Sequence, residues 1–284
     1  MKVLFCTDGS KISYGAVVNF SKWFNNFNTD ILTVADWSCL SDNLLSEYSI
    51  IQNKCANNAD SILNYTQEFL LNNDINFNQK IKSCGSVVDA VLEKEKEEDY
   101  SYIIVGSNGK KGLQKWLGSV SYDISSFSDT SVYISKNSIS SDRVAFSLDS
   151  SLISSKRFMQ TLKNINLQGK EIHLLTVYEI PDYLFLEGNI DSNWVIDINE
   201  KQNREGMIIL SKYEEIFKDL GCNNCIKRVL SGNCAIEIVR YCADNVIGIV
   251  VCGMRNRKYL SKLIPGSISR RILEDTKSDV LIMK

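Results

Sequence analysis

The 284-residue chain repeats itself, and this repeat constrains its fold more than any other feature. Each half opens with a short apolar run that ends in an aspartate, Val3–Asp8 in the first half and Val144–Asp149 in the second. A later apolar run in each half ends in a glycine, and these residues, Gly106 and Gly253, stand 147 positions apart. A nearly constant offset between equivalent positions is typical of a duplicated domain with small loop insertions.

The sequence therefore predicts two domains of one kind, covering residues 1–136 and 143–284. The stretch Asn137–Asp142 between them is short, polar and without periodicity, so it is predicted to be the linker. Within each half, five apolar runs alternate with helical segments, of which Ile51–Leu71 and Gly206–Leu220 are the clearest. Strands joined by helices of this length need crossover connections. The predicted fold class is thus α/β, with two tandem, doubly wound, Rossmann-like domains of five parallel strands each.

Composition narrows the function classes. The chain holds 32 Lys and Arg against 34 Asp and Glu, and no basic stripe is visible, which argues against a nucleic-acid partner. No apolar run approaches the roughly 18 residues of a membrane span, and the N-terminus turns polar too soon for a secretory signal. Nine cysteines, an odd number spread over the chain, favour free thiols in a reducing compartment. These features predict a soluble, cytoplasmic protein.

A glycine-rich segment follows the fourth apolar run of the first half. It reads Gly106-Ser107-Asn108-Gly109 and is followed by Gly118-Ser119, where a helix begins. Glycines admit close approach of an anion, and the amides of a helix N-terminus can bind phosphate. Two interpretations stay open, because the same glycines could merely turn the chain after a strand. Asp8 and Asp149 are equally open to two roles, ligand contact or capping of the following helix.

Taken together, these motifs resemble those of the universal stress proteins. An aspartate follows the first strand, Gly-x-x-Gly follows the fourth, and Gly-Ser opens the last helix, once in each half. The nucleotide-binding branch of that family carries Gly-x-x-Gly-x9-Gly-Ser/Thr for ATP. The resemblance implies a tandem universal stress protein with adenine nucleotide alpha hydrolase-like domains, a role in stress response, and binding of ATP, with or without Mg²⁺. It also implies that Ser131–Lys136 and Val280–Lys284 pair antiparallel in an intramolecular pseudo-dimer, while a further homodimer stays open.

Neither half matches the ATP motif completely. The first half has Gly106 and Gly109, but only eight residues separate Gly109 from Gly118. The second half has the nine-residue spacing before Gly266, but Asn256 stands where the second glycine belongs. Asparagine tolerates the left-handed backbone better than most residues, although its Cβ would approach the phosphate. The motif therefore predicts a site in one or both halves and leaves open which half binds.

The resemblance also assigns roles to individual residues. In the first half it places the ribose contact on Asp8 and the adenine contact on Val34. It places the phosphate contacts on Gly106, Gly109, Gly118, Ser119, Val120 and Ser121. The corresponding residues of the second half are Asp149, Val177, Gly253, Gly266, Ser267, Ile268 and Ser269, with Arg255 and Arg257 as further cations.

Three classes of function remain. The first is a regulator whose adenine-nucleotide state changes its protein partner, and the second is a nucleotide-free interaction module in which both motifs have decayed. The third is an enzyme such as an ATPase. No carboxylate pair or activated nucleophile accompanies the glycine loop, which favours a binding protein with at most slow ATP hydrolysis.

Three other features are interpreted as structural. The only histidine, His173, lies in a strand-like run and is expected to be a hydrogen-bonded core residue. Cys222 and Cys225 have the spacing of half a zinc site, but the sequence nearby completes no four-ligand set. The charged run 93–99 is expected to be the solvated end of a helix.

Overall fold

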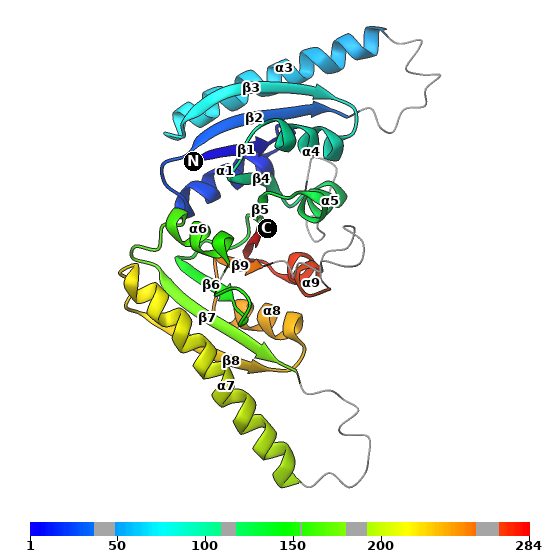
Figure 1. The fold of residues 1–284 in the computed structure, drawn as a ribbon. Helices are drawn as coiled ribbons and strands as arrows, with labels where there is room; N and C mark the ends of the chain where they lie inside the picture. The colour runs from blue at the N-terminus through cyan, green and yellow to red at the C-terminus, as the bar shows by residue number, and fades with distance from the viewer. Residues whose placement is uncertain (37–48, 109–117, 154, 180–191, 254–266) are drawn as a thin grey trace.

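The structure is a computed structural model, and it describes residues 1–36, 49–108, 118–153, 155–179, 192–253 and 267–284. Both halves have the same succession of elements (Figure 1). In the first half these are β1 (Lys2–Cys6), α1 (Lys11–Trp23), β2 (Asn28–Ala35), α3 (Ser49–Asn72), β3 (Phe77–Cys84), α4 (Val87–Glu97), β4 (Tyr102–Gly106), α5 (Ser119–Phe127) and β5 (Ser131–Ser135). In the second half they are β6 (Arg143–Ser147), α6 (Lys156–Asn164), β7 (Glu171–Tyr178), α7 (Ser192–Asp219), β8 (Cys225–Ser231), α8 (Cys234–Asp244), β9 (Ile249–Gly253), α9 (Ser267–Asp275) and β10 (Asp279–Met283).

All described strands belong to one ten-stranded sheet with the order β3-β2-β1-β4-β5-β10-β9-β6-β7-β8. Within each half, neighbouring strands run parallel. The halves meet where β5 and β10 pair antiparallel, with Leu281 opposite Tyr133. The predicted fold class and the predicted pseudo-dimer are therefore confirmed. Because the two half-sheets run in opposite directions, their carboxyl ends lie at opposite edges of the common sheet.

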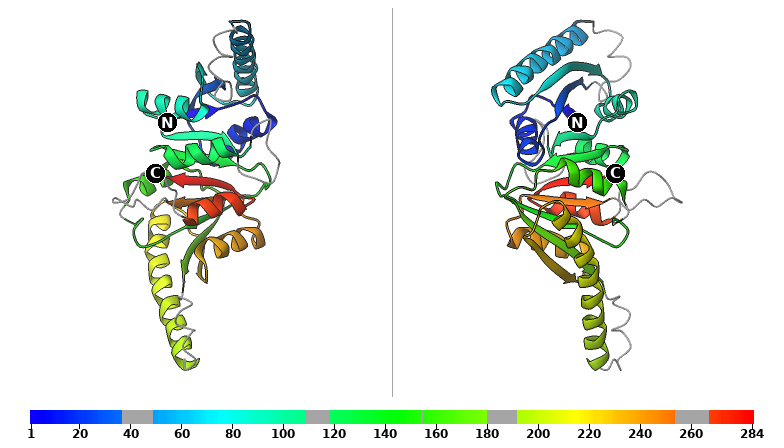
Figure 2. Two further views of the ribbon diagram at one scale, coloured as in Figure 1. Left: turned by 90° about the vertical axis from the view of Figure 1, so that its right-hand side faces the viewer. Right: turned by 60° about the vertical axis from the view of Figure 1, so that its left-hand side comes forward.

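Helices cover both faces of the sheet (Figures 1 and 2). On one face α1, α3, α6 and α7 pack over a buried cluster that includes Phe20, Phe146, Phe158 and Phe217. On the other face α4, α5, α8 and α9 cover a second cluster. Each cluster draws side chains from both halves, so the two hydrophobic cores continue across the junction. Among the helices that the structure describes, none is long and apolar enough to cross a membrane.

Polar contacts also cross the junction between the two halves. The buried carboxylate of Asp279 accepts hydrogen bonds from Tyr133 Oη at 2.5 Å and Ser135 Oγ at 2.9 Å. Two equivalent lysines then reach across. Lys136 Nζ donates to the carbonyl of Leu273 in α9, and Lys284 Nζ donates to the carbonyl of Ser126 in α5. Each half thus places a lysine at the C-terminal end of the other half's last helix, where the helix dipole favours a cation.

A second contact joins the halves beyond the sheet. Phe24 and Ile165, which follow α1 and α6 at equivalent positions, form an isolated antiparallel bridge. Lys170 Nζ lies 5.0 Å from the centre of the Trp23 ring, a cation–π arrangement. The two domains are therefore held together on one face as well as along the sheet.

Candidate functional site

The strand order reverses once in each half, which gives each half one candidate ligand position. In the first half the chain moves from β1 outward to β2 and β3, and then returns to the other side of β1 to form β4 and β5. The order therefore reverses between β1 and β4, and in the second half between β6 and β9. In open parallel sheets such a reversal leaves a crevice beyond the carboxyl ends of the strands, where ligands bind.

Three predicted residues of the first half lie at this edge. Asp8 follows β1, Val34 lies near the end of the adjacent β2, and Gly106 ends β4 on the other side of β1. The end of β1 is held against β2 by hydrogen bonds from Thr7 N to the carbonyl of Leu32, at 2.9 Å, and from Thr33 Oγ1 to the carbonyl of Thr7, at 3.1 Å. Val34 is half-buried, so part of its side chain is accessible at the edge.

The turn after β1 shows what each polar residue does. Gly9 has a φ of +74°, which only glycine adopts readily, and Ser10 N donates to Asp8 Oδ1 at 3.0 Å. The cap of α1 is Ser10, whose side chain accepts from Ser13 N. The capping role that the sequence allowed for Asp8 is therefore wrong. Asp8 instead braces the turn through one carboxylate oxygen, as aspartates in Asx turns do.

The second half builds the same edge with a longer turn. Asp149 follows β6, with Leu148 between strand and aspartate, and its Oδ1 accepts from Ser151 N at 2.8 Å. The cap of α6 is Ser155, six residues beyond the aspartate, so the capping role is wrong for Asp149 as well. Val177 lies in β7 and is half-buried, at the position that Val34 has in β2.

Packing explains the two strand-end glycines. A Cβ built on Gly106 would lie 3.0 Å from Ile12 Cγ2, and one on Gly253 would lie 2.9 Å from Leu152 Cδ2. In each half an apolar side chain from the segment after the first strand, Ile12 or Leu152, therefore lies against the strand-end glycine. At Gly106 the backbone of Ile12 and Ser13 also lies 3.3 Å away, so this position favours glycine whether or not a ligand binds, whereas the end of the Leu152 side chain could move away from a Cβ at Gly253.

The N-terminus of α5 differs from those of the other helices whose start is described. Side chains cap α1, α4, α6 and α8 through Ser10, Ser86, Ser155 and Asn233. At α5 the cap is Gly118, which has no side chain to accept a bond from the first turn. Ser119 and Val120 in that turn are exposed. The first-turn amides of a helix need partners, and an anion is one that suits them.

Serines of the last helix in each half tie the helix to the sheet. Ser121 is buried, and its Oγ donates to the carbonyl of Gly106 at 2.6 Å. Ser269 makes the equivalent contact with the carbonyl of Gly253 at 3.4 Å. Their hydroxyl protons are therefore used within the protein.

Ser267 begins α9, next to Ile268, which is half-buried. The predicted residues Gly109, Gly266, Arg255 and Arg257 lie outside the described residues.

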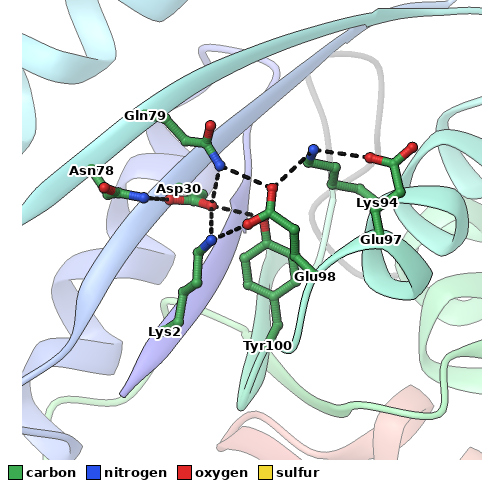
Figure 3. Close-up of polar contacts among 8 residues, drawn as sticks. All are labelled: Lys2, Asp30, Asn78, Gln79, Lys94, Glu97, Glu98 and Tyr100. Atoms are coloured by element: carbon green, nitrogen blue, oxygen red, sulfur yellow. Dashed lines mark hydrogen bonds and ion pairs between the residues drawn. The ribbon is translucent and has the colours of Figure 1, made fainter.

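Sequence reasoning missed a polar cluster at the amino edge of the first half (Figure 3). The fully buried carboxylate of Asp30 accepts from Asn78 Nδ2 and Gln79 Nε2, both at 2.7 Å, and from Tyr100 Oη at 2.8 Å. Lys2 Nζ lies 3.0 Å from Asp30 Oδ2. Burial raises the pKa of Asp30, but these hydrogen bonds outweigh burial and hold the pKa below its ordinary value.

The cluster continues to the end of α4. Lys2 and Lys94 both pair with the carboxylate of Glu98, and the bond from Lys2 is the largest reason why the pKa of Glu98 falls to about 2. The charged run 93–99 is therefore only partly solvated, because Glu98 is held in an ion-pair network. Local spacing gave no signal of this, since Lys2 is 96 residues away.

The only histidine is a hydrogen-bonded core residue, as the sequence predicts. His173 is buried, with Nδ1 2.8 Å from Tyr241 Oη and Nε2 2.9 Å from Glu171 Oε1, and burial lowers its pKa. Seven cysteines have side chains that the structure describes, and these are free thiols. Burial raises the pKa of Cys225 to about 11. Among the described residues, no group of three or more His, Cys, Asp or Glu could hold a metal ion.

The fold is that of a tandem, doubly wound α/β protein with one reversal of strand order per half. The sequence model of the Universal stress protein family matches residues 1–136 and again residues 142–284, so the chain belongs to that family. Comparison with curated protein sequences gave no match.

Solved structures support the same fold. A universal stress protein from Archaeoglobus fulgidus DSM 4304 aligns with a TM-score of 0.68 and 20% identity, over 100% of this chain and 96% of its own. A protein from Pseudomonas aeruginosa UCBPP-PA14 assigned to the same family aligns with a TM-score of 0.63 and 12% identity, over 100% and 92% of the two chains. At these identities the likeness concerns the fold alone, and it extends over both halves.

Proposed function

We propose that this chain is a stress-response regulator that binds an adenine nucleotide, ATP in the first instance, at the carboxyl edge of one or both half-sheets. The observation that carries the proposal is the N-terminus of α5. It follows the strand end at Gly106, lies at the reversal of strand order, and has no side-chain cap. Family membership supports the choice of nucleotide, because these residues follow the glycine motif of the family's ATP-binding branch, with eight residues in place of nine between Gly109 and Gly118.

Each part of the nucleotide would have its own contacts. The phosphates would accept hydrogen bonds from the amides of Ser119 and Val120 at the first turn of α5. The ribose hydroxyls would donate to Asp8, and the adenine would lie against Val34. In the second half the corresponding positions are Asp149, Val177 and the first turn of α9. Mg²⁺, where it accompanies ATP, would be held mainly by the phosphates.

The proposed role is signalling rather than turnover. We expect at most slow ATP hydrolysis, a cytoplasmic location, and a protein partner that distinguishes the loaded from the empty state. The seven free thiols support a reducing compartment. A second candidate is a nucleotide-free interaction module. It is favoured by the packing contacts of Gly106, since these account for that glycine without a ligand.

The first experiment uses the protein as purified. It is denatured, any released nucleotide is identified by mass, and the moles per chain are counted. Close to one or two equivalents of an adenine nucleotide would support the proposal and give the number of occupied halves. No released nucleotide, together with no thermal shift in millimolar Mg-ATP, would contradict it and favour the nucleotide-free module.

A charge placed at the phosphate position tests the site itself. Ser119→Glu puts a carboxylate on the first turn of α5, where it suits the helix dipole but repels a phosphate. We expect an unchanged thermal midpoint without ligand and at least a tenfold weaker Kd for ATP, or about 1.4 kcal/mol. Ser140→Glu, an equal charge change on the exposed linker, is the control.

The same change in the other half assigns the site. Ser267→Glu alters the first residue of α9, so it should weaken ATP binding only where the second half is occupied. If neither Ser119→Glu nor Ser267→Glu changes an affinity that the wild-type protein shows, the nucleotide binds elsewhere and the assignment of both helix ends is wrong.

A further inference from the structure

Two equivalent stretches of the chain contain no acidic residue. They are residues 9–29, which include α1, and residues 150–170, which include α6. In the chain as a whole about one residue in eight is Asp or Glu, since 34 of the 284 are acidic. The basic residues of the two stretches are Lys11, Lys22, Lys156, Arg157, Lys163 and Lys170. Acids are thus missing from the same place in both halves, whereas bases are present in both.

The fold brings these two stretches together. Phe24 and Ile165, which directly follow α1 and α6, form the isolated antiparallel bridge, so the C-terminal ends of the two helices meet. Both helices lie on the same face of the sheet, one on each side of the β5–β10 junction (Figure 1). Lys22 and Lys163 each precede a bridged residue by two positions, so both lie close to the junction.

The exposed lysines of each helix lie on its outer side. Lys11 and Lys22 are eleven positions apart, close to three full turns, and Lys156 and Lys163 are seven apart, close to two. The centre of the buried side lies about half a turn away in both helices. All four lysines are exposed. They form one surface that continues from one half to the other, the α1–α6 basic surface.

This surface keeps an excess of positive charge. In the described part of the structure, Lys11, Lys156 and Lys163 form no ion pair. Asp142 of the linker lies near Lys22, but its carboxylate is paired with Lys170. The net charge of the whole chain is −2. The bases are therefore concentrated on one face of a chain that is slightly acidic overall, and neither stretch is a basic run in the sequence.

A hollow with apolar side chains lies along α6 within this surface. Its lining includes Ile153 and Met159 together with Gln160 and the two lysines of α6. The lysines are exposed, whereas Ile153 and Met159 are half-buried and pack against the hydrophobic core below. The hollow therefore offers apolar contact beneath a charged rim.

The chemistry of the surface favours an acidic protein segment over other anionic partners. Surfaces for single-stranded nucleic acid add aromatic side chains on which the bases stack, and membrane-binding helices insert Trp, Phe or Leu. On α1 and α6 the aromatic side chains are all buried, namely Tyr14, Phe20, Trp23 and Phe158. An acidic segment with spaced apolar residues could pair its carboxylates with the lysines and place an apolar side chain in the hollow.

We propose that the α1–α6 basic surface binds an acidic segment of a partner protein that carries spaced apolar side chains. The contact spans both halves, so it requires the paired chain and not one domain alone. Salt screens contacts between exposed charges, so the affinity falls as salt is raised. The contact needs no nucleotide, and this proposal and the proposed function can therefore fail separately.

Fluorescence anisotropy with the full chain at low salt tests the proposal. The probe is a short labelled peptide with three glutamates to each leucine, and the reference peptide has lysine in place of glutamate. We expect saturable binding of the acidic peptide only. Lys156→Glu with Lys163→Glu, and Lys11→Glu with Lys22→Glu, should each weaken this binding at least tenfold.

The matched control reverses two exposed lysines outside this surface. Lys96→Glu with Lys201→Glu makes the same change in net charge on α4 and α7, and it should leave the affinity unchanged. Circular dichroism shows whether each variant keeps its fold. The absence of saturable binding overturns the proposal, and so does an equal loss in the control and in the surface variants. A DNA oligonucleotide or a phosphatidylserine vesicle that competes as well as the unlabelled acidic peptide also overturns it, because the surface would then select only negative charge.

Discussion

The two halves have the same strand pairing near the amino ends of their strands, but one equivalent position there carries a carboxylate in the first half and an imidazole in the second. Asp30 pairs with Leu4 across β1 and β2, and His173 pairs with Ala145 across β6 and β7, so the two residues occupy equivalent positions. Asp30 is a buried charge with an ammonium and three neutral donors around it. His173 has only Tyr241 and Glu171 as partners.

The difference shows what a buried group demands of its surroundings. An ionised carboxylate removed from water needs several donors, and the first half recruits them from β1, β3 and Tyr100 just before β4. A neutral imidazole needs only one donor and one acceptor. A position of a duplicated fold can therefore hold a charged side chain in one half and a neutral one in the other, provided that the number of hydrogen-bond partners around it changes as well.

The largest effect is expected when the buried charge is removed. Asp30→Ala leaves Lys2, Tyr100 and both amide side chains without their common acceptor, and we expect the free energy of unfolding to fall by about 3–5 kcal/mol. Urea denaturation measures this. Asp30→Asn keeps the shape and part of the bonding, so its loss should be smaller. A loss below about 1 kcal/mol for Asp30→Ala would contradict the central role of this carboxylate.

The junction is where the halves should behave alike. Burial lowers the pKa of both Lys136 and Lys284 from 10.5 to about 8. Between these values the unfolded chain binds more protons than the folded one, so the folded state gains stability as pH rises from about 8 to 10.5. Lys136→Met and Lys284→Met should each remove a similar part of this rise in urea titrations. A large inequality between them would show that the pseudo-symmetry does not extend to the energetics.

A smaller effect is expected at the equivalent histidine. His173→Leu loses two hydrogen bonds, one of them to the half-exposed Glu171, and should cost about 1 kcal/mol at pH 7.5. The pKa of His173 is lowered by burial, so as pH falls below about 6.5 the unfolded chain takes up the proton first and the wild type loses stability. The difference between wild type and variant should therefore shrink at pH 5. A difference that grows instead would mean that the folded state holds the imidazole charged.

The smallest effect is expected at the exposed side of the first-half cluster. The pKa of Glu98 is lowered from 4.5 to about 2, so its contribution is present above about pH 4.5 and is lost as pH falls toward 2. Glu98→Gln should flatten the acid limb of the stability curve in this window. The exposed Glu93 on the same helix provides the matched control, and Glu93→Gln should leave that limb unchanged.

Sequence reasoning predicted what repeats along the chain. The duplication and the alternation of strands and helices follow from apolar periodicity. The β5–β10 pairing is implied by the resemblance to the universal stress proteins, and two apolar terminal strands that would otherwise be bare edges add support. Sequence reasoning could not predict the Lys2–Glu98 pair, because the two residues are far apart and each resembles an ordinary surface charge. It also left Asp8 and Asp149 open as helix caps, whereas serines two and six residues later cap the helices. The length of an irregular turn leaves no periodic signal.

Because β5 and β10 belong to one chain, their pairing does not depend on protein concentration. Separate domains would have to meet by diffusion, and the fraction paired would vary with the amount of protein. Here the six-residue linker 137–142 keeps the partner strands at an effective concentration of about millimolar or higher. A single chain at any dilution therefore has its central strands paired. The outer strands β3 and β8, whose lysines and arginine resist further strand addition, remain the only edges among the described strands.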